Sequence, residues 1–149
     1  MDECTTALNE LINIVTSDPV LHRPNYDLPL TLEVDASQYA TGTILYQPND
    51  KGRLCPMGYH SHTLNPAERG YDVHDQELLA VMRGLRQWRH LLLSSPFTTT
   101  VITDHANLQY YRQLQKINRR VARYLADLAD YRFTLVHKPG MSNKADHLS

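Results

Sequence analysis

Four acidic residues stand beside stretches that have the pattern of a protein core: Asp35, Glu77, Asp104 and Asp146. An unpaired charge next to a core is costly, and several carboxylates in one place repel each other unless divalent cations hold them together. No histidine or cysteine joins them at ligand spacing, so their hard oxygen atoms favour Mg²⁺ or Mn²⁺ over zinc. The four residues are therefore candidate ligands for divalent cations.

Each of these acids also has a simpler interpretation. Taken singly, an acid at the edge of a core can accept a hydrogen bond from a nearby amide or pair with an arginine. The spacing of the four residues along the chain does not establish that they meet after folding. A structural role for each acid and a shared metal site both stay open at this level.

The elements that must position these acids follow from the spacing of apolar residues. This spacing predicts strands at residues 30–37, 40–47, 54–62, 98–103 and 133–137. It predicts helices from Asp72 to about Ser94, around residues 106–114, at residues 118–130, and near Lys144 at the end. Three strands with short links indicate an antiparallel meander, within a mixed α/β domain. Asp35 and Asp104 meet only if strand 98–103 lies beside strand 30–37.

The first 28 residues differ in character from the rest of the chain. Apolar residues at helical spacing predict an amphipathic helix at residues 3–16. Residues 19–28 contain two prolines and predict an irregular connector. We therefore expect a tail or linker at residues 1–28 and a folded domain at residues 29–149.

Composition argues against several classes of protein. With 42% hydrophobic and 21% charged residues among 149, the chain does not resemble a disordered segment. Its apolar stretches are far shorter than the roughly 20 residues of a membrane span, and its N-terminus lacks the pattern of a secretory signal. Cys4 and Cys55 form no CxxC motif. We therefore expect no disulfide and an intracellular, reduced protein.

The distribution of charge permits contact with nucleic acid but does not require it. Acidic residues are concentrated in residues 1–35, and the remainder of the chain is net positive. Arg119, Arg120 and Arg123 lie on the predicted helix 118–130 and are candidates for contacts with phosphates. The alternative is an ordinary solvated helix surface.

Five sequence strings carry a resemblance to a known family. TLEVDASQYATGTILYQ, GYHSHTLNPAERGYDVHDQELLAV, WRHLLL, TDHANLQYY and PGMSNKADHLS occur in this order. They resemble the ribonuclease H domain of reverse transcriptases from gypsy-class long-terminal-repeat retrotransposons. The similarity runs from about residue 17 to residue 149. It implies a ribonuclease H-like fold: a five-stranded mixed sheet with helices on both faces, with the fourth strand parallel to the first.

The resemblance implies a catalytic role for all four acids. In that family two Mg²⁺ ions, for which Mn²⁺ can substitute, flank the scissile phosphate of the RNA strand. By resemblance, Asp35 bridges both ions, Asp146 helps to hold the ion that carries the attacking water, and Glu77 and Asp104 complete the other. The expected reaction is a two-metal displacement that leaves a 5′-phosphate and a 3′-hydroxyl.

Candidate substrate contacts lie next to these acids. Ala36, Ser37 and Gln38 directly follow Asp35 and are placed to approach the RNA strand, which is recognised in a shallow minor groove. His105, beside Asp104, is a candidate for an orienting role. The segment Asn143-Lys144-Ala145-Asp146 is a shorter variant of the family motif and leaves little room for the histidine-bearing loop of cellular ribonucleases H. The roles of His137 and His147 stay open.

The sequence thus predicts a metal-dependent endoribonuclease that acts on RNA–DNA hybrids during reverse transcription. The expected partners are the hybrid and the polymerase domain of the same polyprotein, without a membrane. The expected location is the cytoplasm, in the virus-like particle of the element. The alternative is an inert ribonuclease H-like module that only connects or tethers neighbouring parts of a polyprotein. The four intact acids weigh against that alternative.

Overall fold

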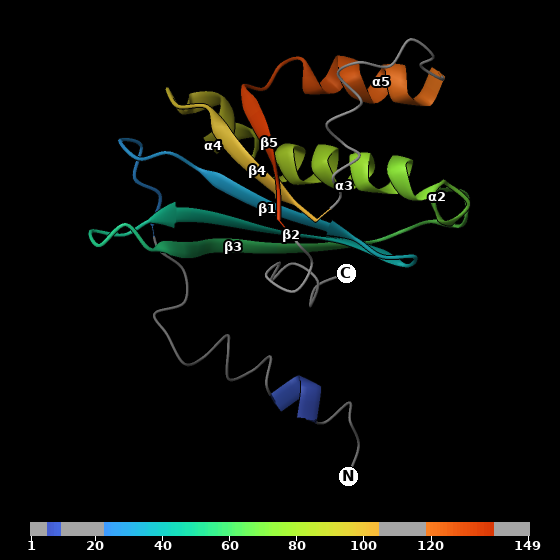
Figure 1. The fold of residues 1–149 in the computed structure, drawn as a ribbon, viewed down its shortest axis with the longest axis horizontal. Coiled ribbons are helices and arrows are strands. Elements are labelled where there is room, and N and C mark those ends of the chain that lie inside the picture. Colours follow the sequence, from blue (N-terminus) through green and yellow to red (C-terminus); the bar gives the residue numbers. More distant parts are fainter. Residues whose placement is uncertain (1–5, 10–22, 105–118, 139–149) are drawn as a thin grey trace.

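A five-stranded mixed sheet forms the centre of the computed structural model, which describes residues 6–9, 23–104 and 119–138 (Figure 1). The strands are β1 (Thr31–Ala36), β2 (Ala40–Pro48), β3 (Leu54–Thr63), β4 (Thr99–Thr103) and β5 (Phe133–His137). Their order across the sheet is β3-β2-β1-β4-β5. Each begins and ends within one or two residues of the predicted strand.

Strand pairing brings together segments that are far apart in the sequence. β1 is antiparallel to β2, with Asp35 opposite Gly42, and β2 is antiparallel to β3. β1 is parallel to β4, with Leu32 opposite Val101. β4 is parallel to β5. The predicted placement of strand 98–103 beside strand 30–37 is confirmed, and with it the mixed sheet.

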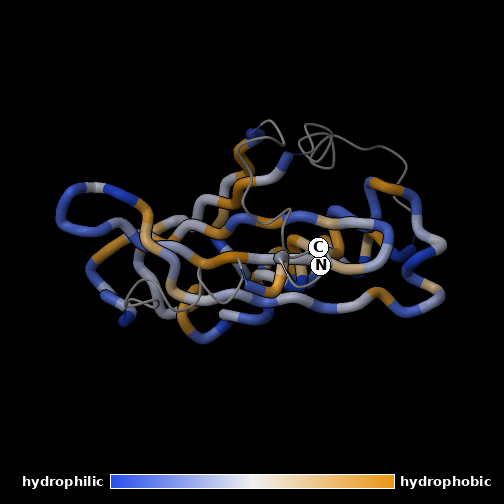
Figure 2. The backbone as a smooth tube through the Cα atoms, turned by 90° about the horizontal axis from the view of Figure 1, so that it is seen from below, coloured by the Kyte–Doolittle hydropathy of each residue, from blue (hydrophilic) through white to orange (hydrophobic). Residues whose placement is uncertain are grey.

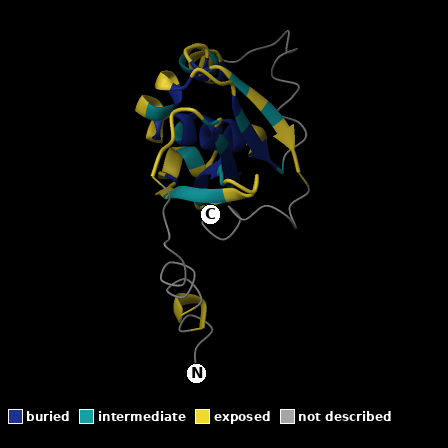
Figure 3. Cartoon of the chain, turned by 90° about the vertical axis from the view of Figure 1, so that its left-hand side faces the viewer, coloured by how far each residue is buried: buried dark blue, intermediate teal, exposed yellow. Residues whose placement is uncertain are grey.

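The described helices after β3 lie on one side of this sheet (Figure 1). They are α2 (Pro66–Arg69), α3 (Val73–Gln87), α4 (Arg89–Ser94) and α5 (Arg119–Leu128). α3 packs on β1 and β2, and α5 packs on α3. A main hydrophobic core lies between these layers, as the buried residues in Figure 3 show. The prediction of helices on both faces is tested here for one face only, because the closing helix near Lys144 lies outside the described residues.

The long helix expected from Asp72 to Ser94 is divided at Trp88. Asp72 is the N-cap, as predicted, and its side chain accepts a hydrogen bond from the backbone N–H of Asp75 at 2.8 Å. Trp88 has φ −113° and ψ 29°, outside the helical range. Its ring lies so close to Gly58 of β3 that a Cβ atom there would be 3.1 Å from Trp88 Nε1. Packing of the indole on the edge strand accompanies the break, and the apolar stripe alone did not reveal it.

Close approach of α3 to the sheet depends on a glycine. A Cβ atom at Gly84 would lie 2.9 Å from side-chain methyl groups of both Leu32 and Thr43, and 3.3 Å from Val34. These contacts also show which sides of β1 and β2 face α3. Figure 2 shows the resulting alternation of hydrophobic and hydrophilic stretches along the backbone.

We therefore expect Gly84→Ala to destabilise the fold. Overpacking of a core costs about 1–3 kcal/mol, whereas alanine contributes about 1 kcal/mol relative to glycine in a helix interior. The expected net result is a loss of roughly 1 kcal/mol in the free energy of unfolding, measured by urea denaturation. A gain in stability would show that α3 can move away from the sheet at little cost.

The second face of the sheet carries a smaller buried cluster. Side chains alternate along a strand, so Glu33, Ile44 and Tyr46 point away from α3. Ile44 and Tyr46 are buried together, separately from the main core. Glu33 is only 5% exposed and accepts a hydrogen bond from Tyr46. Burial and the adjacent Glu33 raise the pKa of Tyr46 well above its usual range, so its hydroxyl stays protonated at neutral pH.

The end of the N-terminal connector is hydrogen-bonded to β2. The buried side chain of Gln47 accepts from the backbone N–H of Asn25 at 2.8 Å and donates to the carbonyls of Asn25 at 2.7 Å and Leu28 at 3.2 Å. Residues 6–9 form an exposed helical turn, within the predicted helix 3–16, whose other residues lie outside the described ranges. The domain boundary near residue 28 stays a prediction.

Two further sequence predictions meet the structure here. Within the described ranges, helices are too short or too polar to cross a bilayer. Cys55 is a free thiol in β3, and Cys4 lies outside the described residues.

Candidate metal centre

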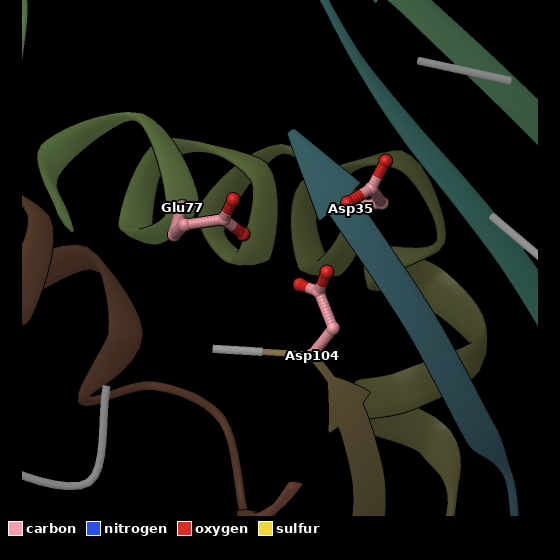
Figure 4. Close-up of side chains that lie close together, drawn as sticks. All are labelled: Asp35, Glu77 and Asp104. Carbon is pink, nitrogen blue, oxygen red and sulfur yellow. The ribbon is translucent and has the colours of Figure 1, made fainter. Parts of the chain in front are cut away.

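Three of the four predicted acids come together at one end of the sheet. Asp35 is the penultimate residue of β1, Glu77 lies in α3, and Asp104 directly follows β4. A carboxylate oxygen from each lies within 4.8 Å of the other two. Figure 4 shows their side chains around a common space. Asp146 lies outside the described residues.

The fold explains this convergence. Because β1 and β4 are parallel neighbours, their carboxyl ends meet at the same edge, where Asp35 and Asp104 stand. Because α3 begins at Val73 and packs on β1, its second turn brings Glu77 to that edge. Three elements separated in the sequence therefore define one cluster.

The donor set of this cluster fits a hard divalent cation. Asp35 is 3% exposed and Glu77 is 1% exposed, and Asp104 is partly exposed. Like charges at such short distances and so little hydration repel one another strongly. Carboxylate oxygens are the ligands that Mg²⁺ and Mn²⁺ prefer. The arrangement agrees with the predicted metal ligands, whose role in binding stays a prediction.

A histidine on the last strand holds the backbone beside Asp104. His137 Nε2 lies 2.8 Å from the carbonyl oxygen of Asp104, so this ring nitrogen donates the hydrogen bond. The neighbouring Lys138 N–H donates to the carbonyl of Thr103 at 2.8 Å. The end of β5 thus fixes the point where the chain leaves β4. Nothing in the residue spacing signalled this role, because it depends on the pairing of β4 with β5.

We expect His137→Ala to weaken metal binding while the metal-free fold stays nearly as stable. Groups that orient metal ligands typically contribute about tenfold or more in metal affinity. The measurement is the Mg²⁺ concentration that gives half of the thermal stabilisation. His137→Gln keeps an N–H donor at a similar reach and is expected to restore the wild-type value. His90→Ala, at an exposed histidine of α4, is the control. Equal midpoints for His137→Ala and His90→Ala would contradict a positioning role.

The predicted substrate residues after Asp35 lie at the end of β1 (Ala36) and in the tight turn that follows it (Ser37 and Gln38). Ser37 N–H donates to the carbonyl of Ala40 at 2.8 Å. Ser37 Oγ accepts from the backbone N–H groups of Tyr39 at 3.2 Å and Ala40 at 3.1 Å. Gln38 is exposed, and Ala36 and Ser37 are partly exposed. These three residues directly follow Asp35 in the chain, and their contact with a substrate stays a prediction.

The three arginines of α5 differ in their surroundings. Arg120 Nη1 donates to Asp75 Oδ2 at 3.0 Å, and its guanidinium lies 3.6 Å from the centre of the Tyr71 ring. These contacts tie α5 to the first turn of α3, two residues before Glu77. Arg119 and Arg123 are exposed and better placed than Arg120 for the predicted phosphate contacts. His105 lies outside the described residues.

Tyr124 of α5 adds a further contact to the same junction. Burial and a hydrogen bond with Tyr71 raise the pKa of Tyr124 to about 12. A tyrosine that stays protonated can keep donating or accepting a hydrogen bond across the physiological range. The junction of α5 with α3 is thus a polar network around Arg120, and the charge pattern alone did not distinguish it from a solvated surface.

This fold and carboxylate cluster define a protein of the ribonuclease H-like class. Residues 1–99 match the family described as the RNase H-like domain found in reverse transcriptase. The chain belongs to this family. The predicted resemblance is confirmed at that level, and Asp104 and Asp146 lie beyond the matched residues.

Known relatives agree with this assignment. The Tf2-3 and Tf2-4 transposon polyproteins of Schizosaccharomyces pombe are each 35% identical to the chain over 148 residues. The match covers 97% of the chain and 11% of each polyprotein, so the chain spans about a tenth of these relatives.

Solved structures confirm the fold. The native prototype foamy virus protease-reverse transcriptase has a TM-score of 0.71 at 17% identity, over 99% of this chain and 20% of the viral one. LC11-RNase H1 in complex with an RNA/DNA hybrid has a TM-score of 0.57 at 14% identity, over 81% of this chain and 92% of the enzyme. The predicted ribonuclease H-like fold is therefore confirmed.

Proposed function

We propose that the chain is the ribonuclease H domain of a gypsy-class retrotransposon polyprotein and cuts the RNA strand of RNA–DNA hybrids during reverse transcription. The convergence of the Asp35, Glu77 and Asp104 carboxylates within 4.8 Å carries this proposal. Asp146 is the fourth proposed member of the set.

Several properties of the cluster suit a phosphodiester hydrolase. Asp35, Glu77 and Asp104 offer oxygen ligands for Mg²⁺, with Mn²⁺ as a substitute. When bound there, two such ions would activate the attacking water and stabilise the leaving oxygen. Asp35 and Asp104 stand at the ends of hydrogen-bonded β-strands, which suits a site whose metal ligands must keep fixed positions relative to the RNA strand. The proposed products carry a 5′-phosphate and a 3′-hydroxyl.

The proposed substrate and partner rest on related proteins. The similar curated proteins are transposon polyproteins. A foamy viral protease-reverse transcriptase, with a TM-score of 0.61 at 19% identity, was solved in complex with an RNA/DNA hybrid. We therefore propose the hybrid as substrate. We propose that the polymerase region of the same polyprotein is the partner that supplies most of the affinity for this hybrid. The proposed location is the cytoplasm, within the particle of the element, and rests on the family resemblance alone.

The test is cleavage of an end-labelled RNA–DNA hybrid by the longer chain that includes the polymerase region. We expect RNA cleavage with Mg²⁺ or Mn²⁺, none with a chelator, and none for a duplex of DNA. DNA synthesis by the same preparation reports whether the polymerase region is folded. Active synthesis without RNA cleavage in either metal would favour the alternative, an inert connecting module.

A further inference from the structure

An exposed tyrosine lies in the turn that directly follows Asp35. Tyr39 is 62% exposed, in the link between β1 and β2. Its backbone is nevertheless fixed, because its carbonyl accepts from the N–H of Leu64 at 2.7 Å, and Leu64 is 1% exposed. The aromatic ring therefore stands in solvent on an anchored backbone.

Arg69 stands beside this ring. Its guanidinium carbon lies 5.9 Å from the centre of the Tyr39 ring, and its Nε donates to the carbonyl of Leu64 at 3.1 Å. Leu64 therefore binds Tyr39 through its N–H and Arg69 through its carbonyl. The tyrosine and the arginine form one preorganised unit. Within the part of the chain that the structure describes, the hydrogen bond of Arg69 uses its Nε, which leaves its other guanidinium N–H groups for an anion.

α2, which carries Arg69, is itself fastened to α3. Asn65 and Glu68 form a capping box at its start. Glu68 also accepts from Arg83 at 2.7 Å, and the side chain of Gln76 donates to the carbonyl of Glu68 at 3.2 Å. Gln76 is the residue before Glu77. The pair is thus held from α3, which carries Glu77, as well as from the turn after β1.

The pair also lies at the correct end of the sheet. Figure 1 shows α2 and the β1–β2 turn at the end where β1 finishes. Tyr39 lies three residues before Gly42, the partner of Asp35 in the hairpin, which is at most about 10 Å at roughly 3.3 Å per residue. That length corresponds to at most about three nucleotide steps along a nucleic-acid strand, at roughly 3.4 Å each.

We infer that Tyr39 and Arg69 form a contact site for the RNA strand of the hybrid, within about three nucleotides of the cleaved phosphate. An aromatic face suits packing against a sugar or base, and a guanidinium suits the next phosphate. This inference rests on the proposed function and extends it to a specific binding site. A contact of the same pair with another part of the polyprotein is the competing explanation.

The test compares Tyr39→Ala with Tyr26→Ala in the longer chain that includes the polymerase region. Tyr26 is 61% exposed and lies in the connector near Gln47, at the other end of β2. We expect Tyr39→Ala to raise KM for hybrid cleavage about tenfold and to change kcat less than twofold. Tyr39→Phe is expected to behave as wild type.

A second variant tests the arginine through the ionic-strength dependence. Loss of one phosphate contact reduces the slope of log affinity against log salt by about one, and we expect this result for Arg69→Gln. Hybrid binding is also measured by fluorescence anisotropy without metal. If wild type binds the hybrid but does not cut it, and Tyr39→Ala weakens binding, the proposed function fails and the contact site stands. The contact site is refuted if the wild-type protein cuts the hybrid and both variants, Tyr39→Ala and Tyr26→Ala, have the same KM for cleavage as wild type.

Discussion

Asp35→Asn is expected to abolish cleavage of the RNA strand. Asp35 is a buried member of the cluster with Glu77 and Asp104, and an amide oxygen is a far weaker cation ligand than a carboxylate. Loss of several kcal/mol of charge stabilisation corresponds to a reduction in kcat of roughly a thousandfold or more. The measurement is single-turnover cleavage of a labelled hybrid with saturating Mg²⁺.

The same variant distinguishes a metal ligand from a structural residue. Removing one of three clustered negative charges relieves repulsion without changing side-chain volume. We therefore expect the metal-free Tm of Asp35→Asn to equal or exceed that of wild type. A structural Asp35 predicts a loss of about 1–3 kcal/mol instead. Asp50→Asn, in the exposed turn at the other end of β2, controls for the general effect of removing a charge. Retained cleavage in Asp35→Asn would end the nuclease assignment.

Mg²⁺ is expected to raise the Tm of the wild-type domain, because a ligand that binds only the folded state stabilises it. At a free Mg²⁺ concentration one hundred times its Kd, this linkage contributes about 2.7 kcal/mol. For a domain of this size the corresponding rise in Tm is about 5–10 °C. Mn²⁺ should act similarly, and a chelator should reverse both effects. The measurement is thermal unfolding, monitored by circular dichroism, with and without each metal ion.

Variants of the cluster separate this effect from general ionic screening. Glu77→Gln and Asp35→Asn are expected to lose most of the rise, whereas Asp50→Asn should keep it. NaCl that supplies the same concentration of positive charge should not reproduce the rise in Tm, because screening by salt acts on all exposed charges and not on one site. A rise of the same size in all variants would contradict a specific site.

Local patterns predicted much of this fold. The alternation in residues 30–37 and the β-branched run at 98–103 were sufficient to place β1 and β4 within one or two residues. The sequence analysis did not predict α2, although a signal for it is present. Asn65 and Glu68 form a capping box, and Pro66 occupies the first helical position. The break at Trp88 carries no local signal, because it depends on contact with Gly58 in a distant strand.

The site was predictable only in part for the same reason. Residue types identified the acids, but their meeting point is a property of the parallel pairing of β1 with β4, which spacing does not reveal. The family resemblance supplied that step. It did not supply the contact of His137 with the Asp104 carbonyl, nor the contact of Arg120 with Asp75, since each joins residues more than thirty positions apart.

The hydrogen bonds between Gln47 and Asn25 have a mechanical consequence. Four residue steps of hydrogen-bonded hairpin separate these bonds from the carboxylates. They run from the Thr31–Tyr46 pair, next to Gln47, to the Asp35–Gly42 pair. At roughly 3.4 Å per step this is a span of about 14 Å. A force applied through the chain before Asn25 would therefore enter the sheet at one end, whereas the carboxylates lie at the other. Because the hydrogen-bonded hairpin separates these two points, we expect such a force to move the domain as one body before it displaces the carboxylates.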